Sequence, residues 1–449
     1  MSGQAASNSK YVSYPDYKDS GVEWLGDVPV NWGVFQGKRV FMNRKESALS
    51  DDAQLAASQA YGVIPQSLLI ELTGSKVMLA LKGTDSFRHV SENDFVISLR
   101  SFEGGIEHSA YIGCVSPAYT VLSAVIPIHP WFYRYLLKCK PYVSALQAST
   151  DSLRDGKSIT FEQFGSIRLP APPLEEQRTI AAFLDYETAR IDSLIDKQQQ
   201  LIELLKEKRQ AVISHAVTKG LTPDAPMKDS GVEWLGQVPE HWRVGRIGYY
   251  CRVENGTTPS KANLDYWTEG TVPWLSSGAV NQYEVREASE MITADALAEC
   301  SLRLLPKDTL VVGMIGQGKT RGMSAITRIE ATINQNLAAV IPNDQLDSEF
   351  LHFVFQAAYR ALRETGRGGN QAALNCELLA NLRFAKPELV AQKEIVQRLK
   401  VEYKKYDHLV SRAQSGIELL QERRIALISA AVTGKIDLRG WTNPTEGSE

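Results

Sequence analysis

The side chains best suited to chemistry are basic and amide groups in glycine-rich runs. Gly316–Arg321 reads GQGKTR, and the surrounding stretch Thr309–Ile329 holds three basic residues and no acidic one. Asn334 and Gln335 follow, and a second glycine-rich group contains Arg367. Such side chains carry the paired donors and acceptors that read base edges, and glycine lets a backbone approach phosphate. These runs predict recognition of nucleic acid.

The first half of the chain carries a weaker set of the same kind, beginning with the adjacent Arg44 and Lys45. For each residue the competing interpretation is an ordinary solvated loop charge. The residues predicted to contact DNA are Arg44, Lys45, Lys82, Arg88, Arg100, Ser101, His108, Arg154, Lys157, Lys261, Ser276, Ser277, Asn281, Gln317, Lys319, Arg321, Asn334, Arg367, Asn370 and Gln371.

One apparent nucleotide-binding motif is rejected. Gly313–Thr320, GMIGQGKT, matches the phosphate-binding loop pattern, which requires a helix to begin at its lysine. The residues that follow, RGMSAITRIEATINQ, contain Gly322 and alternating β-branched side chains, so we expect a strand there. The sequence also lacks an adenine-methylating Asn-Pro-Pro-aromatic tetrapeptide. We therefore predict no catalytic residue and no cofactor bound by this chain.

Composition places the chain among ordinary globular proteins. It has 449 residues, 43% of them hydrophobic and 22% charged, which is enough for two or three domains. The five cysteines form no CxxC pair and the seven histidines are scattered, so no metal site is predicted. No apolar run is long enough to span a membrane, and we expect a cytoplasmic location. The net charge of -3 argues against indiscriminate coating of nucleic acid but permits a local basic surface.

Two long helices must position these groups. Glu175–Val217 contains no proline or glycine, and its apolar residues recur at helical spacing; Lys393–Val432 repeats it at an offset of 215. About 40 residues make a helix of about 60 Å. Identical stripes predict a two-stranded coiled coil, antiparallel because a globular segment separates the helices. The predicted interface residues are Ile191, Leu194, Ile202, Leu205, Val212, Leu409, Ile417, Leu420 and Leu427.

A second repeat defines the architecture. Lys18–Trp32 (KDSGVEWLGDVPVNW) returns as Lys228–Trp242 (KDSGVEWLGQVPEHW), so the chain is segment, helix, segment, helix with a pseudo-twofold repeat. We predict an α+β fold with two globular domains joined by two long antiparallel coiled-coil helices. The predicted segments are 1–17, a disordered tail; 18–172, domain 1; 173–221, helix 1; 222–386, domain 2; 387–436, helix 2; and 437–449, a C-terminal tail.

Each globular segment is expected to hold short strands followed by a helix. The predicted strands are Ala60–Ile64, Lys76–Ala80, Phe95–Leu99, Ala110–Cys114, Tyr119–Val125, Val272–Leu275, Thr309–Gly313, Met323–Ile326 and Leu337–Ile341, and the predicted helices are Pro130–Ala148 and Ser348–Thr365.

These motifs together resemble a known family. The WLGxVPxxW runs at Trp24–Trp32 and Trp234–Trp242 precede the repeated helices, and GGIEHSAYIGCVSPAYTVL lies at Gly104–Leu122. GTTPSKANLDYW at Gly256–Trp267 and VPWLSSGAVN at Val272–Asn281 complete the set. In this order they resemble the specificity subunit of type I restriction-modification enzymes, over essentially the whole chain.

The resemblance implies a role without chemistry of its own. Two target-recognition domains would each read half of a bipartite site in double-stranded DNA, and the helices would set the gap. The helices would also dock two methyltransferase subunits, which use S-adenosylmethionine, while restriction and translocation subunits needing ATP and magnesium join the complex. The alternative from a different class is a protein–protein scaffold, in which the tandem domains bind partner proteins.

Overall fold

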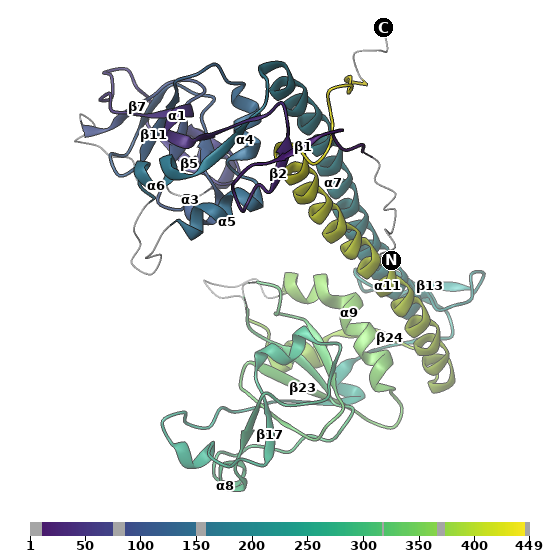
Figure 1. Ribbon diagram of the computed structural model, residues 1–449. Helices are drawn as coiled ribbons and strands as arrows, with labels where there is room; N and C mark the ends of the chain where they lie inside the picture. The colour runs from purple at the N-terminus through teal and green to yellow at the C-terminus, as the bar shows by residue number, and fades with distance from the viewer. Residues whose placement is uncertain (1–10, 75–85, 150–158, 317, 366–372, 445–449) are drawn as a thin grey trace, which may run out of the picture. The chain divides into compact units, whose positions relative to one another are not determined.

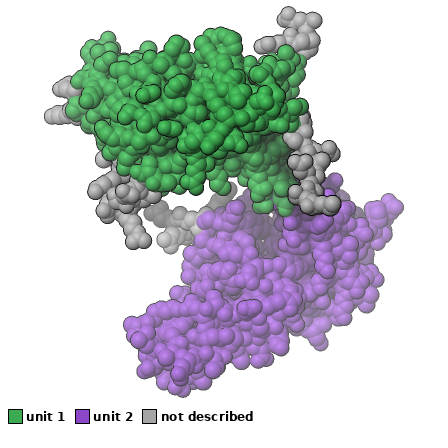
Figure 2. All heavy atoms as spheres, viewed as in Figure 1, with its two compact units in different colours: residues 1–198, 415–449 green, residues 199–414 purple. Residues whose placement is uncertain are grey.

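The computed structural model describes residues 11–74, 86–149, 159–316, 318–365 and 373–444. It divides into two compact units, here unit 1 (Met1–Gln198 with Ser415–Glu449) and unit 2 (Gln199–Gln414), coloured separately in Figure 2. Two long helices, α7 (Leu174–Lys219) and α11 (Leu389–Val432), each contribute to both units. The unit boundary therefore cuts both helices, whereas the sequence treats each helix as a segment of its own.

The two predicted long helices are confirmed, and their ends have local causes. Pro172 and Pro173 precede α7, and two glutamates in its first turn favour the positive end of the helix dipole. The helix stops before Gly220, whose φ of +77° belongs to the left-handed region; helix α11 stops before Gly434, which has a φ of +72°. A Cβ at Gly434 would come within 2.4 Å of Pro29, so only glycine fits there.

Helices α7 and α11 lie side by side and run antiparallel (Figure 1). In unit 1, Arg424 of α11 pairs with Asp192 of α7 at 2.9 Å. In unit 2, Arg209 of α7 pairs with Asp407 of α11 at 3.9 Å. The two pairs are copies of each other at the repeat offset of 215, which extends the pseudo-twofold repeat from sequence to contacts.

A buried glutamine at the start of each long helix repeats in the same way. Gln177 accepts a hydrogen bond from the His129 backbone at 2.8 Å and donates to a proline carbonyl at 2.8 Å. Gln392 accepts from the Asp347 backbone at 2.8 Å and donates to a proline carbonyl at 2.9 Å. Because buried amides need partners, these bonds fix each globular segment to its helix in the same manner.

The predicted helix interface is partly corrected. Ile191, Ile202, Ile417 and Leu427 are buried, but Leu194 and Leu409 are 41% and 38% exposed. A two-stranded antiparallel pair covers only a narrow stripe of each helix, so apolar residues beside that stripe stay accessible. The three remaining predicted residues, Leu205, Val212 and Leu420, are half-buried.

Unit 1 is built on short antiparallel strands. Its main sheet has the order β4-β11-β8-β9, and helices α4 and α5 share its core. The elements are β1 (Tyr17–Asp19), β2 (Asp27–Pro29), β3 (Gly33–Gln36), α1 (Gly37–Val40), β4 (Phe41–Arg44), β5 (Leu55–Ser58), β6 (Gly62–Pro65), α2 (Gln66–Thr73), β7 (Arg88–Val90), β8 (Phe95–Ile97), α3 (Ser101–Gly104), β9 (Glu107–His108), β10 (Gly113–Val115), β11 (Thr120–Ala124), α4 (Pro130–Leu136), α5 (Lys140–Ala148), α6 (Phe161–Ser166) and β12 (Arg168–Ala171).

Unit 2 holds a five-stranded sheet of order β16-β23-β20-β21-β18 and a smaller one of order β19-β17-β22. The elements are β13 (Met227–Asp229), β14 (Gln237–Pro239), β15 (Arg243–Arg246), β16 (Cys251–Asn255), β17 (Val272–Leu275), β18 (Glu284–Val285), β19 (Glu290–Ile292), α8 (Ala294–Glu299), β20 (Leu310–Gly313), β21 (Ser324–Thr327), β22 (Thr332–Ile333), β23 (Leu337–Pro342), α9 (Ser348–Thr365), α10 (Cys376–Asn381) and β24 (Arg383–Lys386), with short 3-10 helices at Ile247–Tyr249, Leu264–Tyr266 and Ser277–Asn281.

Most predicted elements are present, with two differences, and one predicted strand is not tested. The single helix expected over Pro130–Ala148 is two helices, because Pro141 lacks the amide hydrogen that a continuous helix would need. Within the tail expected to be disordered, Tyr14 is only 4% exposed and its hydroxyl donates to Glu176. The aromatic ring gains enough burial to order residues 11–17. The strand expected over Lys76–Ala80 lies outside the described residues.

The helix pairing predicts a contrast between two neighbouring residues. Replacing Ile191, which is 3% exposed, by alanine should lower the free energy of unfolding by about 2–5 kcal/mol, since the residue fills the core. Replacing the 41% exposed Leu194 by alanine should change it by about 0.5 kcal/mol or less. Chemical denaturation of both variants measures the difference. Equal losses would contradict the assigned interface.

Candidate nucleic-acid interface

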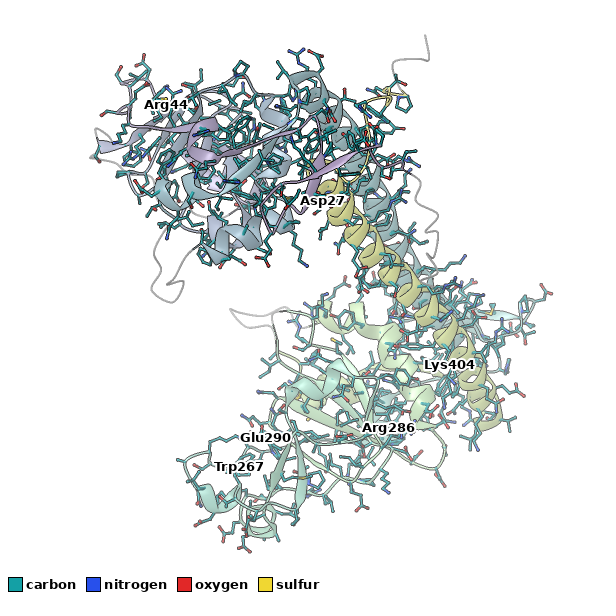
Figure 3. The ribbon with its side chains drawn as sticks, viewed as in Figure 1. Asp27, Arg44, Trp267, Arg286, Glu290 and Lys404 are labelled. Atoms are coloured by element: carbon teal, nitrogen blue, oxygen red, sulfur yellow. The ribbon has the colours of Figure 1, made fainter. Side chains whose placement is uncertain are left out.

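Several predicted contact residues in unit 1 are instead bonded within the fold. Arg44 on β4 (Figure 3) donates from Nε to Asp94 at 2.8 Å and from Nη2 to the Ser123 hydroxyl at 3.1 Å. It also pairs with Glu46 at 3.0 Å. These bonds occupy the guanidinium and tie β4 to the turn before β8. We therefore remove Arg44 from the candidate interface.

Burial corrects two further predictions in unit 1. Ser101 is 1% exposed, and its hydroxyl accepts a hydrogen bond from the Ser98 backbone at 2.8 Å. His108 is 6% exposed; its Nε2 lies 3.1 Å from the Asn93 side-chain oxygen, and its ring packs against Trp131. Burial lowers the pKa of His108 to about 4, assisted by the nearby Arg134 charge. A buried neutral histidine stabilises the fold and is not available to DNA.

Two hollows lie beside these residues. The larger, of about 760 Å³, adjoins His108 and the ion pair of Lys138 with Glu107, whose nitrogen and oxygen are 2.7 Å apart. Helix α11 contributes to the same wall through Ile425 and Ile428. The smaller hollow, of about 410 Å³, is polar and is lined by Asn43, Lys45 and Arg88 among others.

In unit 2, some predicted residues are exposed and others are not. Lys261 is exposed, lies 3.3 Å from the centre of the Trp267 ring and pairs with Glu290. Trp267 and Glu290 are labelled in Figure 3. Asn334 is 7% exposed and donates to the Ser277 hydroxyl at 3.2 Å, so both side chains serve the fold. Ser276 is half-buried and Asn281 is exposed.

The GQGKTR run forms the connection between β20 and β21. The Tyr359 hydroxyl of α9 donates to the Lys319 carbonyl at 2.8 Å, and Arg363 donates to the Gly318 carbonyl at 2.8 Å. Arg321 in turn donates to the Arg363 carbonyl at 3.0 Å. Helix α9 thus holds the backbone of the run while the Lys319 side chain is exposed. The strand expected after Thr320 is confirmed as β21, where a phosphate-binding loop would need a helix.

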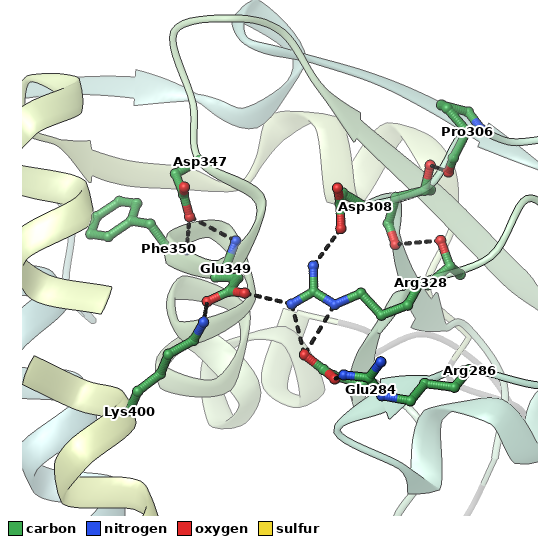
Figure 4. A network of polar contacts seen from close by, with 11 residues as sticks. Glu284, Arg286, Pro306, Asp308, Arg328, Asp347, Glu349, Phe350 and Lys400 are labelled. Atoms are coloured by element: carbon green, nitrogen blue, oxygen red, sulfur yellow. Dashed lines mark hydrogen bonds and ion pairs between the residues drawn. The ribbon is translucent and has the colours of Figure 1, made fainter. Parts of the chain in front are cut away.

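Arg328, which the sequence groups with that basic run, forms a separate network (Figure 4). It pairs with Glu284 at 2.7 Å and also with Asp308 and Glu349. Glu349 in turn pairs with Lys400 of α11. Opposite charges surround the guanidinium and raise its pKa against the lowering effect of burial. The network therefore connects the sheet of unit 2 to the long helix, and its carboxylates engage the Arg328 guanidinium.

The remaining predicted residues divide into two groups. Lys45, Arg100, Asn281 and Lys319 are exposed, and Arg88 is half-buried. The others lie outside the described residues: Lys82, Arg154, Lys157, Gln317, Arg367, Asn370 and Gln371.

The described residues give no indication of a metal centre or a membrane segment. Within them, no three His, Cys, Asp or Glu side chains are grouped to hold a metal ion. Their helices include none that is both long and apolar enough to cross a bilayer.

The chain is a duplicated α+β protein, and each unit contains part of both long helices. Each unit also has exposed basic side chains, Lys45 and Arg100 in unit 1 and Lys261 and Lys319 in unit 2. A family model for the type I restriction modification DNA specificity domain matches residues 29–204 and again 239–417. The chain belongs to this family. The two matches fall on the two copies of the internal repeat.

Similar proteins agree with this assignment. The MjaIX specificity subunit of a type I restriction enzyme from Methanocaldococcus jannaschii is 27% identical over 43% of this chain, so the match spans less than half (44%) of that relative's own length. The MjaVIII specificity subunit of the same organism is 24% identical over 92% of this chain and 94% of its own. A chain solved in work on assembly and conformational transition of the type I R-M system has the same fold, with a TM-score of 0.69, 16% identity, and coverage of 91% of this chain and 99% of its own.

The buried imidazole of His108 predicts a pH dependence of stability. Its pKa of about 4 lies below the ordinary value of 6.5, so the unfolded chain takes up the proton first as the pH falls. The free energy of unfolding should drop by about 2 kcal/mol between pH 7 and pH 5 from this group. His108→Asn should reduce the drop by that amount in denaturant titrations at the two pH values. An unchanged pH dependence would contradict the assigned burial.

Proposed function

We propose that this chain is the DNA specificity subunit of a type I restriction-modification complex and that each unit reads one half of a bipartite DNA site. The duplication carries the proposal. The family match, the buried glutamines and the interhelical ion pairs all occur twice, once per unit. Two copies of a recognition domain match a DNA site made of two separate sequence blocks, because each copy can bind one block.

The long helices also suit docking of two identical partners. Leu204 and Leu419 are 62% and 66% exposed, and Leu194 and Leu409 are 41% and 38% exposed. Each pair is related by the repeat offset of 215. Accessible apolar residues on a helix are typical of a protein interface, and their duplication supports two copies of one methyltransferase subunit.

The chain supplies target choice in this scheme, and its partners supply the chemistry. Methyl transfer with S-adenosylmethionine is assigned to the methyltransferase subunits. ATP and magnesium are assigned to the restriction and translocation subunits that join the complex. The complex acts on double-stranded DNA, and we assign it to the cytoplasm.

Salt dependence separates a DNA reader from a protein scaffold. We expect the assembled complex to lose DNA affinity steeply as salt rises, because each neutralised phosphate contributes about -0.9 to the slope of log affinity against log salt. Fluorescence anisotropy with a labelled duplex measures the slope. A slope near zero, with partner-protein binding retained, would instead identify the chain as a scaffold.

Helix length provides a second prediction. Seven residues inserted at matching positions of α7 and α11 add about two turns, or about 10 Å, while keeping the heptad stripe in phase. We expect the gap in the recognised site to lengthen by about 3 base pairs and both sequence blocks to stay the same. Mapping methylated sites in cells that carry the variant measures this change. Retention of the original gap would show that the helices do not set it.

A further inference from the structure

The small polar hollow of unit 1 is lined by two side chains that each have a buried polar atom without a hydrogen-bond partner among the described residues. Asn43 and Lys45 of the β4 region face it together with Arg88 of β7. The side-chain oxygen of Asn43 and the Nε of Arg88 are both buried and have no hydrogen-bond partner among the described residues. Burying such atoms unpaired costs about 1–3 kcal/mol each, so they favour a ligand that supplies both a donor and an acceptor.

The neighbouring residues on the same two strands are fully bonded. Arg44 beside Asn43 pairs with Asp94 at 2.8 Å, and His89 beside Arg88 lies 2.8 Å from Asp52. Successive side chains of a strand point to opposite faces, so Asn43 and Arg88 are turned away from these ion pairs. The paired side chains hold the strands in place, whereas the Asn43 side-chain oxygen and the Arg88 Nε have no hydrogen-bond partner among the described residues.

The backbone below the hollow is also fixed. The His89 amide donates to the Glu46 carbonyl at 3.0 Å, and the Ala48 amide donates to the Phe87 carbonyl at 2.9 Å. These bonds connect the segment after β4 to the start of β7. Base-reading side chains need such support, because bidentate hydrogen bonds require a fixed orientation.

We propose that Arg88 and Asn43 are the base-reading pair of unit 1, an inference that rests on the proposed function. Arginine matches the two acceptors of guanine in the major groove, and asparagine matches the donor and acceptor of adenine. The two residues therefore specify a guanine and an adenine in the block read by unit 1. Lys45, exposed at the rim, contacts a phosphate and positions the DNA.

The pattern of donors and acceptors favours bases over phosphate within the hollow. Lys45 and Arg88 line it together with Glu46, whose carboxylate already pairs with Arg44 at 3.0 Å. The unpaired side-chain oxygen of Asn43 can only accept a hydrogen bond, and a phosphate has no donor to offer it. A base edge supplies a donor as well as acceptors and therefore uses both the amide and the guanidinium.

Methylation mapping tests the pair, with unit 2 as an internal reference. Arg88→Ala should reduce the preference for guanine over other bases at one position by about 5- to 140-fold. Asn43→Ala should reduce the preference for adenine at one position of the same block to a similar degree. The other block and the gap should stay unchanged. Lys45→Ala should weaken methylation equally at all sites, and the exposed Arg39→Ala, which lies outside the hollow, serves as the matched control.

Each alternative outcome is informative. If Arg88→Ala leaves both blocks intact, the inference is wrong while the proposed function stands. If it lowers methylation at every site without changing the motif, Arg88 contacts phosphate and the base-reading role is wrong. If the unaltered chain produces no two-block motif, the proposed function itself fails. Should a variant abolish methylation, binding of its purified complex to duplexes with single substitutions measures the same discrimination directly.

Discussion

The antiparallel burial of α7 against α11 is the contact on which the rest of the structure depends. The core of unit 1 includes Leu184 of α7 together with Leu427 and Val432 of α11. The core of unit 2 includes Ile213 of α7 and Leu399 of α11 in the same way. Unit 1 completes its core only with the distant segment Ser415–Glu449, whereas the core of unit 2 lies within the continuous segment Gln199–Gln414. Both long helices therefore contribute apolar side chains to the core of each unit, and in unit 1 the helix pairing brings the two ends of the chain segment together.

Whether a side chain already has hydrogen-bond partners within the fold, rather than its residue type, distinguishes side chains that stabilise the fold from those proposed to bind DNA. Arg44 and Arg328 are surrounded by carboxylates that fix strands and helices, whereas Arg88 leaves its Nε unpaired beside a hollow. Paired guanidinium groups are expensive to release, because separation would leave buried charges without compensation. We therefore expect DNA recognition to depend on the smaller set of side chains whose donors and acceptors have no partner within the protein.

The sequence predicts the frame of the molecule better than its site. Ser348–Thr365 matches α9 because its apolar residues keep a helical period, and the long helices are evident from their repetition. By contrast, the pairing of β3 with β12 joins distant segments that no local pattern connects. Arg44 and Arg88 look equivalent in sequence, since the position of Asp94 next to Arg44 is a tertiary property. Asn43 was missed for the same reason, because no local pattern shows that its side-chain oxygen is buried without a partner among the described residues.

The most direct measurement is a genome-wide map of methylated bases in cells that carry the partner methyltransferase subunits with and without this chain. The account predicts a single motif of two short blocks around a fixed gap, present only when the chain is expressed. Methylation that is the same in both cells would contradict it, because target choice would then lie elsewhere.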